Sequence, residues 1–465
     1  MPRWARLLIV VGVSVCLYLI PTPQGLSADT WHLFAIYIGA MVGLVARPFS
    51  EPVLFITAVA ICSILFRQTS VFLEGYSEGI PWLIFSAFMI GASFIKTGLG
   101  PRVAYLLIGL FGKTTLGLGY VMTFTDALLA FVTPSNAART GGIVLPIIRG
   151  VAKALDSDPG PTARRIGSYL ILNAYQVSLT TGYLTLTGVA PNLLIAKFAH
   201  DILGVQVTWP LWFAASIVPS GIMLLLIPYI VYKFYPPELK RIDNKKLSAE
   251  GLAALGPMSG KEKILVSLFV LAILGWTTGS ITKIDVTAVA LGVMSMIMVT
   301  GILTWEDIMH QHQAWHTLIW YGGILGLVAG LVKGKFFIWM ASVIKASFSF
   351  GGMDPMLILF IITVFSLLIR YFFASGGAYV ATMVPVFYTI GLIAQIPVLP
   401  LALVLAFSHC YGSLMTHYGS SAGVILQGTG YVPVSKFWQM GPIIAAVSLI
   451  LTFASIPYWK LIGLW

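Results

Sequence analysis

The stretch FVTPSNAARTGGIVLPIIRG, residues 131–150, interrupts a chain that is otherwise strongly apolar. It brings a proline, a serine, an asparagine, an arginine and two adjacent glycines close together. This composition disfavours a continuous transmembrane helix, because proline removes a backbone donor and glycine weakens helices. The stretch therefore predicts irregular backbone with its tip at Ser135 and Asn136, between two short helical segments.

The composition places the chain in a membrane. Of the 465 residues, 58% are hydrophobic and 9% are charged, whereas a soluble domain has about 25% charged residues. The mean hydropathy is +0.92. Apolar segments long enough to cross a hydrocarbon core of about 30 Å recur along the whole length. We therefore expect an all-α polytopic protein with about eleven transmembrane helices and no sizeable soluble catalytic domain.

The formal net charge of +11 comes mostly from Lys and Arg in short segments between the apolar ones. Such a bias sets the orientation of a membrane protein, so we expect no nucleic-acid partner. Arg3 and Arg6 place the N-terminus in the cytoplasm, and the polar segment 236–263 becomes a cytoplasmic linker. We thus expect a multi-pass protein of the cytoplasmic membrane, with a first half at 1–235 and a second half at 264–465.

The interruption recurs in the second half. FVTPSNAARTGGIVLP (131–146) has a counterpart in FFASGGAYVATMVP (372–385), where a serine is again followed by small residues and then by a proline. Each copy precedes a second interruption rich in Thr, Gly and Ser. We predict re-entrant hairpins near 114–150 and 354–390, and broken helices near 178–199 and 405–428.

Paired interruptions of this kind have a functional meaning. Irregular backbone at membrane depth is tolerated only where it is buried in protein or lines a wet cavity. Broken elements at corresponding positions of two halves are typical of secondary transporters with inverted repeats and a binding site near the membrane centre. The alternatives are glycine and proline kinks in packed helices, a channel, and a membrane-embedded enzyme. The chain lacks an HExxH motif and a credible GxSxG motif, which disfavours the enzyme.

Three motifs carry a family resemblance: TPSNAARTGGIVLPI, RYFFASGGAYVATMVPV and LMTHYGSSAGVILQGTGYV. With them the chain resembles the divalent anion/sodium symporter (DASS) family, most closely its branch of bacterial di- and tricarboxylate antiporters, of the citrate/succinate type, and plastid 2-oxoglutarate/malate translocators. The resemblance implies a homodimer of elevator type, each protomer having a scaffold domain and a transport domain. It also implies substrates such as malate, succinate, fumarate, 2-oxoglutarate or citrate, and no enzymatic activity.

The chain departs from the Ser-Asn-Thr pattern that the family shows at both hairpin tips. The first tip has Ser135, Asn136 and Ala137, and the second has Ser375, Gly376 and Gly377. The missing side chains would supply oxygen ligands, which hard cations prefer. We therefore predict sodium-independent antiport without a cofactor, and keep sodium-coupled symport as the alternative.

The resemblance and the breaks together select the candidate site residues. The substrate-binding candidates are Ser135, Asn136, Ala137, Ser375, Gly376, Gly377, Thr187, Asn192, Thr416, His417, Gly419 and Ser420. The charge-compensating candidates are Arg139, Arg370 and His417, since a dicarboxylate brings negative charge into a medium of low dielectric constant. The alternatives are headgroup contact for Arg139 and an interfacial anchor for Arg370.

A histidine-rich stretch, HQHQAWH at 310–316, is a weaker candidate. His312 and His316 have the i, i+4 spacing that could ligate a metal if the segment is helical. Because the stretch lies in a polar link beside Glu306 and Asp307, we interpret it as an interfacial loop and expect no metal site.

Overall fold

The computed structural model describes residues 1–347 and 352–464, which form helices and connecting loops with no assigned strand among them. The predicted all-α class is confirmed. The first half contains α1 (Arg3–Leu19), α2 (Ala28–Ala46), α3 (Glu51–Phe66), α4 (Thr69–Ser77), α5 (Gly79–Thr97), α6 (Leu99–Phe111), α7 (Thr115–Ala130), the π-helix η1 (Ala137–Val144), α8 (Leu145–Ala154), α9 (Gly167–Leu184), α10 (Ala190–Phe198), the π-helix η2 (Ala199–Leu203) and α11 (Trp209–Phe234).

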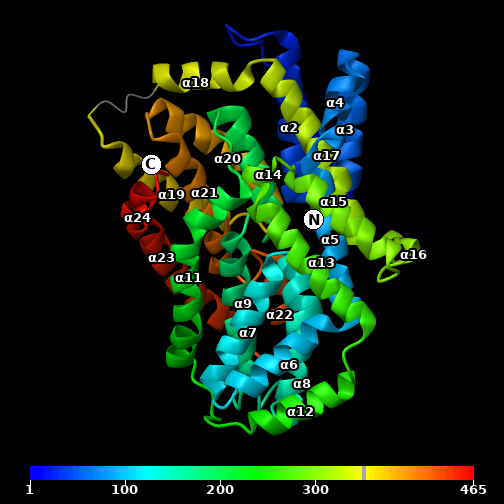
Figure 1. Cartoon of the computed structure of the whole chain (residues 1–465). Helices are drawn as coiled ribbons and strands as arrows, with labels where there is room; N and C mark the ends of the chain where they lie inside the picture. The colour runs from blue at the N-terminus through cyan, green and yellow to red at the C-terminus, as the bar shows by residue number, and fades with distance from the viewer. Residues whose placement is uncertain (348–351, 465) are drawn as a thin grey trace.

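The linker and the second half contain α12 (Asn244–Leu255), α13 (Gly260–Thr277), α14 (Gly279–Thr282), α15 (Val286–Val299), α16 (Trp305–Met309), α17 (His312–Lys333), α18 (Phe336–Ser347), α19 (Pro355–Arg370), α20 (Gly376–Ile393), α21 (Val398–Gly412), the 3-10 helix η3 (Ser413–Met415), α22 (Ser421–Gln427), α23 (Val434–Ala454) and α24 (Ile456–Leu461). Helices of the two halves intermix, since α17 packs among α3, α4 and α5. In Figure 1, α2, α3, α4 and α17 lie in the upper part, and α6, α8 and α12 lie at the lower end.

Seven helical segments of the described residues are long and apolar enough to cross a membrane. They are Ala28–Ala46, Thr69–Thr97, Trp209–Phe234, His312–Lys333, Gly376–Ile393, Val398–Met415 and Val434–Leu461. Further apolar helices, including α3, α7 and α19, are shorter. The chain is thus a polytopic membrane protein, while the figure of about eleven crossings stays a prediction.

The regions predicted as hairpins and broken helices have interrupted backbones. In the first hairpin region α7 ends at Ala130, and η1 begins at Ala137 and continues into α8. In the second, α19 ends at Arg370 and α20 begins at Gly376. The loop 185–189 separates α9 from α10, and the loop 416–420 separates η3 from α22. Whether these elements form a transport domain that moves against a scaffold stays a prediction.

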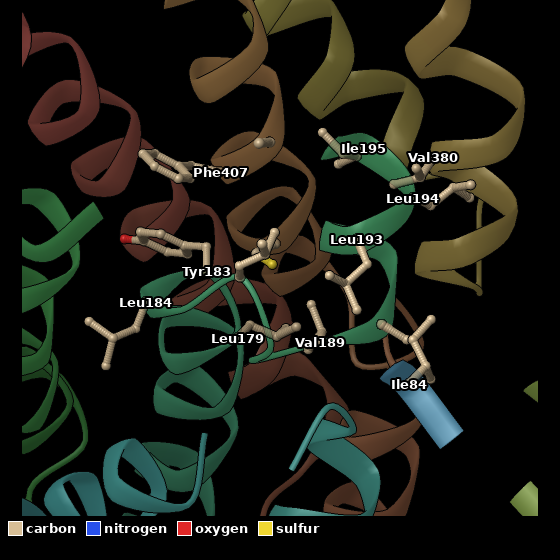
Figure 2. Close-up of a cluster of buried hydrophobic side chains, with 14 of the residues drawn as sticks. Ile84, Leu179, Tyr183, Leu184, Val189, Leu193, Leu194, Ile195, Val380 and Phe407 are labelled. Atoms are coloured by element: carbon tan, nitrogen blue, oxygen red, sulfur yellow. The ribbon is translucent and has the colours of Figure 1, made fainter. Parts of the chain in front are cut away.

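The loop between α9 and α10 is buried among apolar side chains. Figure 2 shows Leu184 and Val189 at its two ends and Phe407 of α21 beside Tyr183 of α9, and all four are buried. The Asn192 side chain donates to the carbonyl of Gly182 in the last turn of α9 at 2.7 Å and to that of Thr185 in the loop at 3.0 Å. Irregular backbone at this depth therefore has protein around it, as a membrane requires.

Within the region 178–199, where the sequence predicts a broken helix, the break lies at 185–189. Helix α10 already begins at Ala190, so Asn192 is helical. The reason is Pro191, because proline is well tolerated in the first turn of a helix, where its missing N–H has no intrahelical acceptor.

The interpretation of 310–316 as a loop is wrong, since α17 begins at His312. Helix α16 precedes it and is started by a capping box between Thr304 and Asp307. Asp307 also pairs with Lys96 of α5. The Lys96 ammonium and the Thr304 groups hold the pKa of the Asp307 carboxyl well below its usual range. Side-chain pairing therefore orders a segment that looks polar and irregular in sequence.

Candidate functional site

A cavity of about 410 Å³ lies where both hairpin tips, both helix breaks and α17 meet. Its volume falls within the range typical of small-molecule sites, about 300–1,000 Å³. Predicted site residues on its lining are Ser135, Asn136, Ser375, Gly376, Gly377, Gly419, Ser420 and Arg370. The structure thus brings together residues that are far apart in the sequence and that come from both halves of the chain.

Four helices begin at this cavity. The lining includes the residues at or next to the N-terminal ends of η1, α10, α20 and the short α22. The first N–H groups of a helix have no intrahelical acceptor, and the helix dipole makes this end positive. Convergent helix starts therefore favour an anion in the cavity.

The two hairpin tips have the same local geometry. The Ser135 hydroxyl accepts a hydrogen bond from the amide of Ala138 at 3.2 Å. The Ser375 hydroxyl accepts one from the amide of Ala378 at 3.3 Å. Each serine therefore caps the helix that follows its tip. This equivalence supports the alignment of the two copies that the sequence pattern indicated.

Arg370 is a buried cation on the lining of the cavity. Its side chain is 2% exposed, and it donates to the carbonyl of Phe373 in the second tip and to the carbonyl of Gly419 in the second break. Its Nε has no hydrogen-bond partner, and within the described ranges no carboxylate lies at ion-pair distance from it. A buried guanidinium without a counter-ion favours binding of a carboxylate.

Arg139 lies in a different environment, and it does not line the cavity. It is fully buried and its Nε lies 3.0 Å from a carboxylate oxygen of Asp126. Its other nitrogens donate to the carbonyls of Thr133, Gly188 and Ser178 and to the hydroxyl of Thr181, at 2.9 to 3.0 Å. The predicted role of Arg139 in compensating substrate charge is therefore not supported, because Asp126 already compensates its charge.

The two arginines nevertheless occupy equivalent positions. Arg139 bridges the carbonyl two residues before Ser135 and the carbonyl of Gly188 in the first break. Arg370 bridges the carbonyl two residues before Ser375 and that of Gly419 in the second break. Each guanidinium thus ties a hairpin tip to an unwound helix. Asp126 neutralises Arg139, whereas Arg370 lines the cavity without an acidic partner among the described residues.

The remaining predicted residues, Ala137, Thr187, Asn192, Thr416 and His417, do not line the cavity. Thr187 donates to the carbonyl of Phe131 at 2.8 Å, and the carbonyl of Thr416 accepts from Tyr175. His417 faces away, where its Nδ1 accepts a hydrogen bond from the Trp438 indole at 3.0 Å. The Thr187 hydroxyl and the Thr416 carbonyl thus help to hold the two breaks in shape, and none of the five residues is placed at the cavity.

Other lining residues were not predicted. His409 of α21 is buried, with its Nε2 2.8 Å from the Asn192 side-chain oxygen. Gln313 and His316 come from α17, Arg47 comes from the turn between α2 and α3, and Glu51 is the first residue of α3. The His409 imidazole is the one polar ring in an apolar run, which is the only signal for it in the sequence. Among the described residues, no three His, Cys, Asp or Glu side chains group as metal ligands.

Asn136 provides a direct test of the first tip. It is partly exposed in the cavity, and its side chain has no hydrogen-bond partner among the described residues. An amide donor to a carboxylate contributes enough that Asn136→Ala should raise the Km for an anionic substrate about tenfold. The variant should still fold, since the amide supports no other contact. A wild-type Km in transport assays would remove Asn136 from the site, and Ser135→Ala should show a milder effect.

Comparisons with known proteins agree along the whole chain. A family model for the sodium:sulfate symporter transmembrane region matches residues 1–465. The chain is 46% identical to the inner membrane protein YbhI of Escherichia coli, over 96% of this chain and 94% of that protein. It is 38% identical to the putative malate transporter YflS of Bacillus subtilis, over 99% and 96% of the two chains. It is also 33% identical to the L-tartrate/succinate antiporter of Shigella boydii, over 97% and 96%.

A solved structure supports the fold. The Alcanivorax borkumensis YdaH transporter is similar with a TM-score of 0.57, covering 99% of this chain and 98% of that one. The sequence identity is 13%, so this similarity concerns the fold alone.

Proposed function

The chain belongs to the sodium:sulfate symporter family, a family of transporters and not of enzymes, and we propose that it exchanges di- or tricarboxylates across the cytoplasmic membrane without sodium. Arg370 carries the proposal. It is a buried guanidinium with a free Nε and no acidic partner in the described residues, on a cavity where helix N-termini converge. Such a site attracts an anion and has a fixed positive charge of its own.

The substrate class follows from the charge and from the relatives. A carboxylate can accept from Arg370 at one end of the cavity and from Asn136 and the first-tip backbone at the other. Two relatives carry malate and L-tartrate/succinate in their names, which supports short dicarboxylates. Malate, succinate, fumarate, 2-oxoglutarate and citrate are the candidates.

The coupling follows from the fixed charge. Moving an unpaired cation through a membrane is costly, so the empty site should stay on its side until an anion fills it. This restriction converts a carrier into an obligatory exchanger. At the first tip the Arg139 guanidinium already takes the carbonyls of Thr133 and Gly188, which a cation would otherwise use. Sodium-coupled symport remains the second candidate, because the family description names sodium:sulfate symport.

Orientation and assembly complete the proposal. The N-terminal segment holds the turn between α2 and α3, since Arg3 and Arg6 donate to the carbonyls of Pro48 and Arg47 at 3.1 and 3.2 Å. That turn also lines the cavity through Arg47. The N-terminus lies in the cytoplasm in this proposal, as the positive-inside rule predicts. A homodimer and an elevator movement of the hairpins against α17 and its neighbours fit the family resemblance.

Reconstituted liposomes test the proposed function. In sodium-free buffer, vesicles loaded with unlabelled succinate should accumulate labelled succinate or malate. The reason is that internal succinate binds the inward-facing site and allows the carrier to return to the outside. Vesicles with empty lumens should take up little. Strong uptake into empty vesicles under an inward sodium gradient would instead identify a symporter. Vesicles loaded with a monocarboxylate such as acetate are the matched control and should behave as empty ones.

A further inference from the structure

One face of α17 forms a wall of the cavity. Gln313, His316, Thr317 and Trp320 all line it, and their spacing of three, four and seven residues puts them on a single helix face. Helix α17 packs among α3, α4 and α5, and so belongs to the part of the molecule that carries neither hairpin. The polar lining of the cavity therefore comes from the hairpins on one side and from α17, which belongs to neither hairpin, on the other.

This face reaches both hairpin tips. The Gln313 amide nitrogen lies 3.4 Å from the Ser135 hydroxyl of the first tip. At the second tip, a Cβ added to Gly377 would lie 2.5 Å from the Trp320 ring, so only glycine leaves room for that ring. His316 lies between these two contacts along α17. The helix thus spans the gap in which a substrate held by both tips would sit.

The second tip is short of side-chain donors. Gly376 and Gly377 provide backbone only, whereas the first tip has the Asn136 amide. His316 lines the same cavity, its side chain is exposed, and no described residue forms a hydrogen bond or ion pair with it. Its neighbours on α17 already have contacts at the tips. His316 is thus the free polar group of this wall.

We propose that His316 binds a substrate carboxylate from α17, in place of the side chains that Gly376 and Gly377 lack, and that it sets the affinity of the site. This rests on the proposed function, because the bound anion is taken to be the transported one. An imidazole N–H can donate a hydrogen bond to a carboxylate oxygen. The other titratable groups that face this cavity are Arg47, Glu51, Tyr321, Arg370, His409 and Cys410.

The test compares two substitutions at one position. With fumarate, His316→Gln should have a Km for exchange about three- to tenfold higher than that of the wild type at the same pH. His316→Lys, which keeps a donor and adds a permanent charge, should have a Km close to that of the wild type. The maximal rate should change less than the Km in both variants.

His312→Gln is the matched control, since His312 lies one turn earlier on α17 and does not line the cavity. The Km of His312→Gln for fumarate should equal that of the wild type. Equal Km values for wild type and His316→Gln would overturn the inference, and so would the same change in His312→Gln. Equilibrium binding of fumarate to purified protein separates the two proposals. Binding that depends on His316 without exchange would contradict the proposed function alone, whereas exchange that is indifferent to His316 contradicts this inference alone.

Discussion

Arg370→Gln is expected to reduce carboxylate exchange by roughly two orders of magnitude while the protein remains folded. Removing one member of a charge pair between protein and ligand in a buried site costs about 2–5 kcal/mol. In the empty protein Arg370 donates only to backbone carbonyls and has no acid to leave unpaired among the described residues. Its loss should therefore affect the bound state more than the fold. Initial rates of exchange in loaded liposomes measure the effect.

Arg370→Lys is the control for charge. It keeps a cation at the cavity but cannot donate to the carbonyls of Phe373 and Gly419 and to a carboxylate at once, since an ammonium has no planar fork. We expect an activity between those of the glutamine variant and the wild type. Wild-type exchange by Arg370→Gln, in a protein with an unchanged melting temperature, would remove the fixed cation from the mechanism.

Arg139→Met is expected to have the largest effect on stability. The substitution leaves the Asp126 carboxylate, which is 2% exposed, without its partner. Breaking a buried ion pair on one side costs about 3–5 kcal/mol. It also removes the donors that join the first tip to the first break. The variant should express poorly and melt well below the wild type in detergent.

The double variant Arg139→Met with Asp126→Asn distinguishes the cost of the unpaired carboxylate from the cost of the lost hydrogen bonds. Because it removes both charges, it should melt above the Arg139→Met single variant. If the pair were an ordinary surface contact, the single variant would melt with the wild type. A double variant that is no more stable than the single one would show that the lost hydrogen bonds, and not the unpaired carboxylate, dominate.

The general plan of this molecule could be predicted from sequence because it depends on repeated local signals. Proline, glycine and serine at corresponding places in two halves marked both tips, and the structure finds Ser135 and Ser375 as equivalent caps. Composition was enough for the all-α membrane class. These features need no knowledge of which helix packs against which.

The roles of individual charges could not be predicted in the same way. Arg139 and Arg370 look alike in sequence, yet Asp126 neutralises one of them. Asp126 is the single acid in 114–150, which was a usable signal. Its partner, however, lies across the hairpin, and only the packing of α7 against η1 brings the two together. The sequence also could not distinguish His417, which faces Trp438, from His316, which faces the cavity.

The wall formed by α17 is the clearest example of what packing adds. Its residues lie about 180 positions from the first tip, and Gln313 is 178 residues from Ser135 in sequence. A helix that is apolar over most of its surface gives no periodic sign of the face that meets a ligand. The spatial position of α17 between the tips therefore came from the structure alone.

The central claim is that a fixed arginine charge makes transport an obligatory, sodium-independent exchange. Counting both directions at once tests it most directly, with one isotope on the internal succinate and another on the external succinate, in sodium-free liposomes. The account predicts that one labelled anion leaves for each one that enters, and that neither moves when the other side is empty. Net influx that needs sodium and proceeds without matching efflux would contradict it.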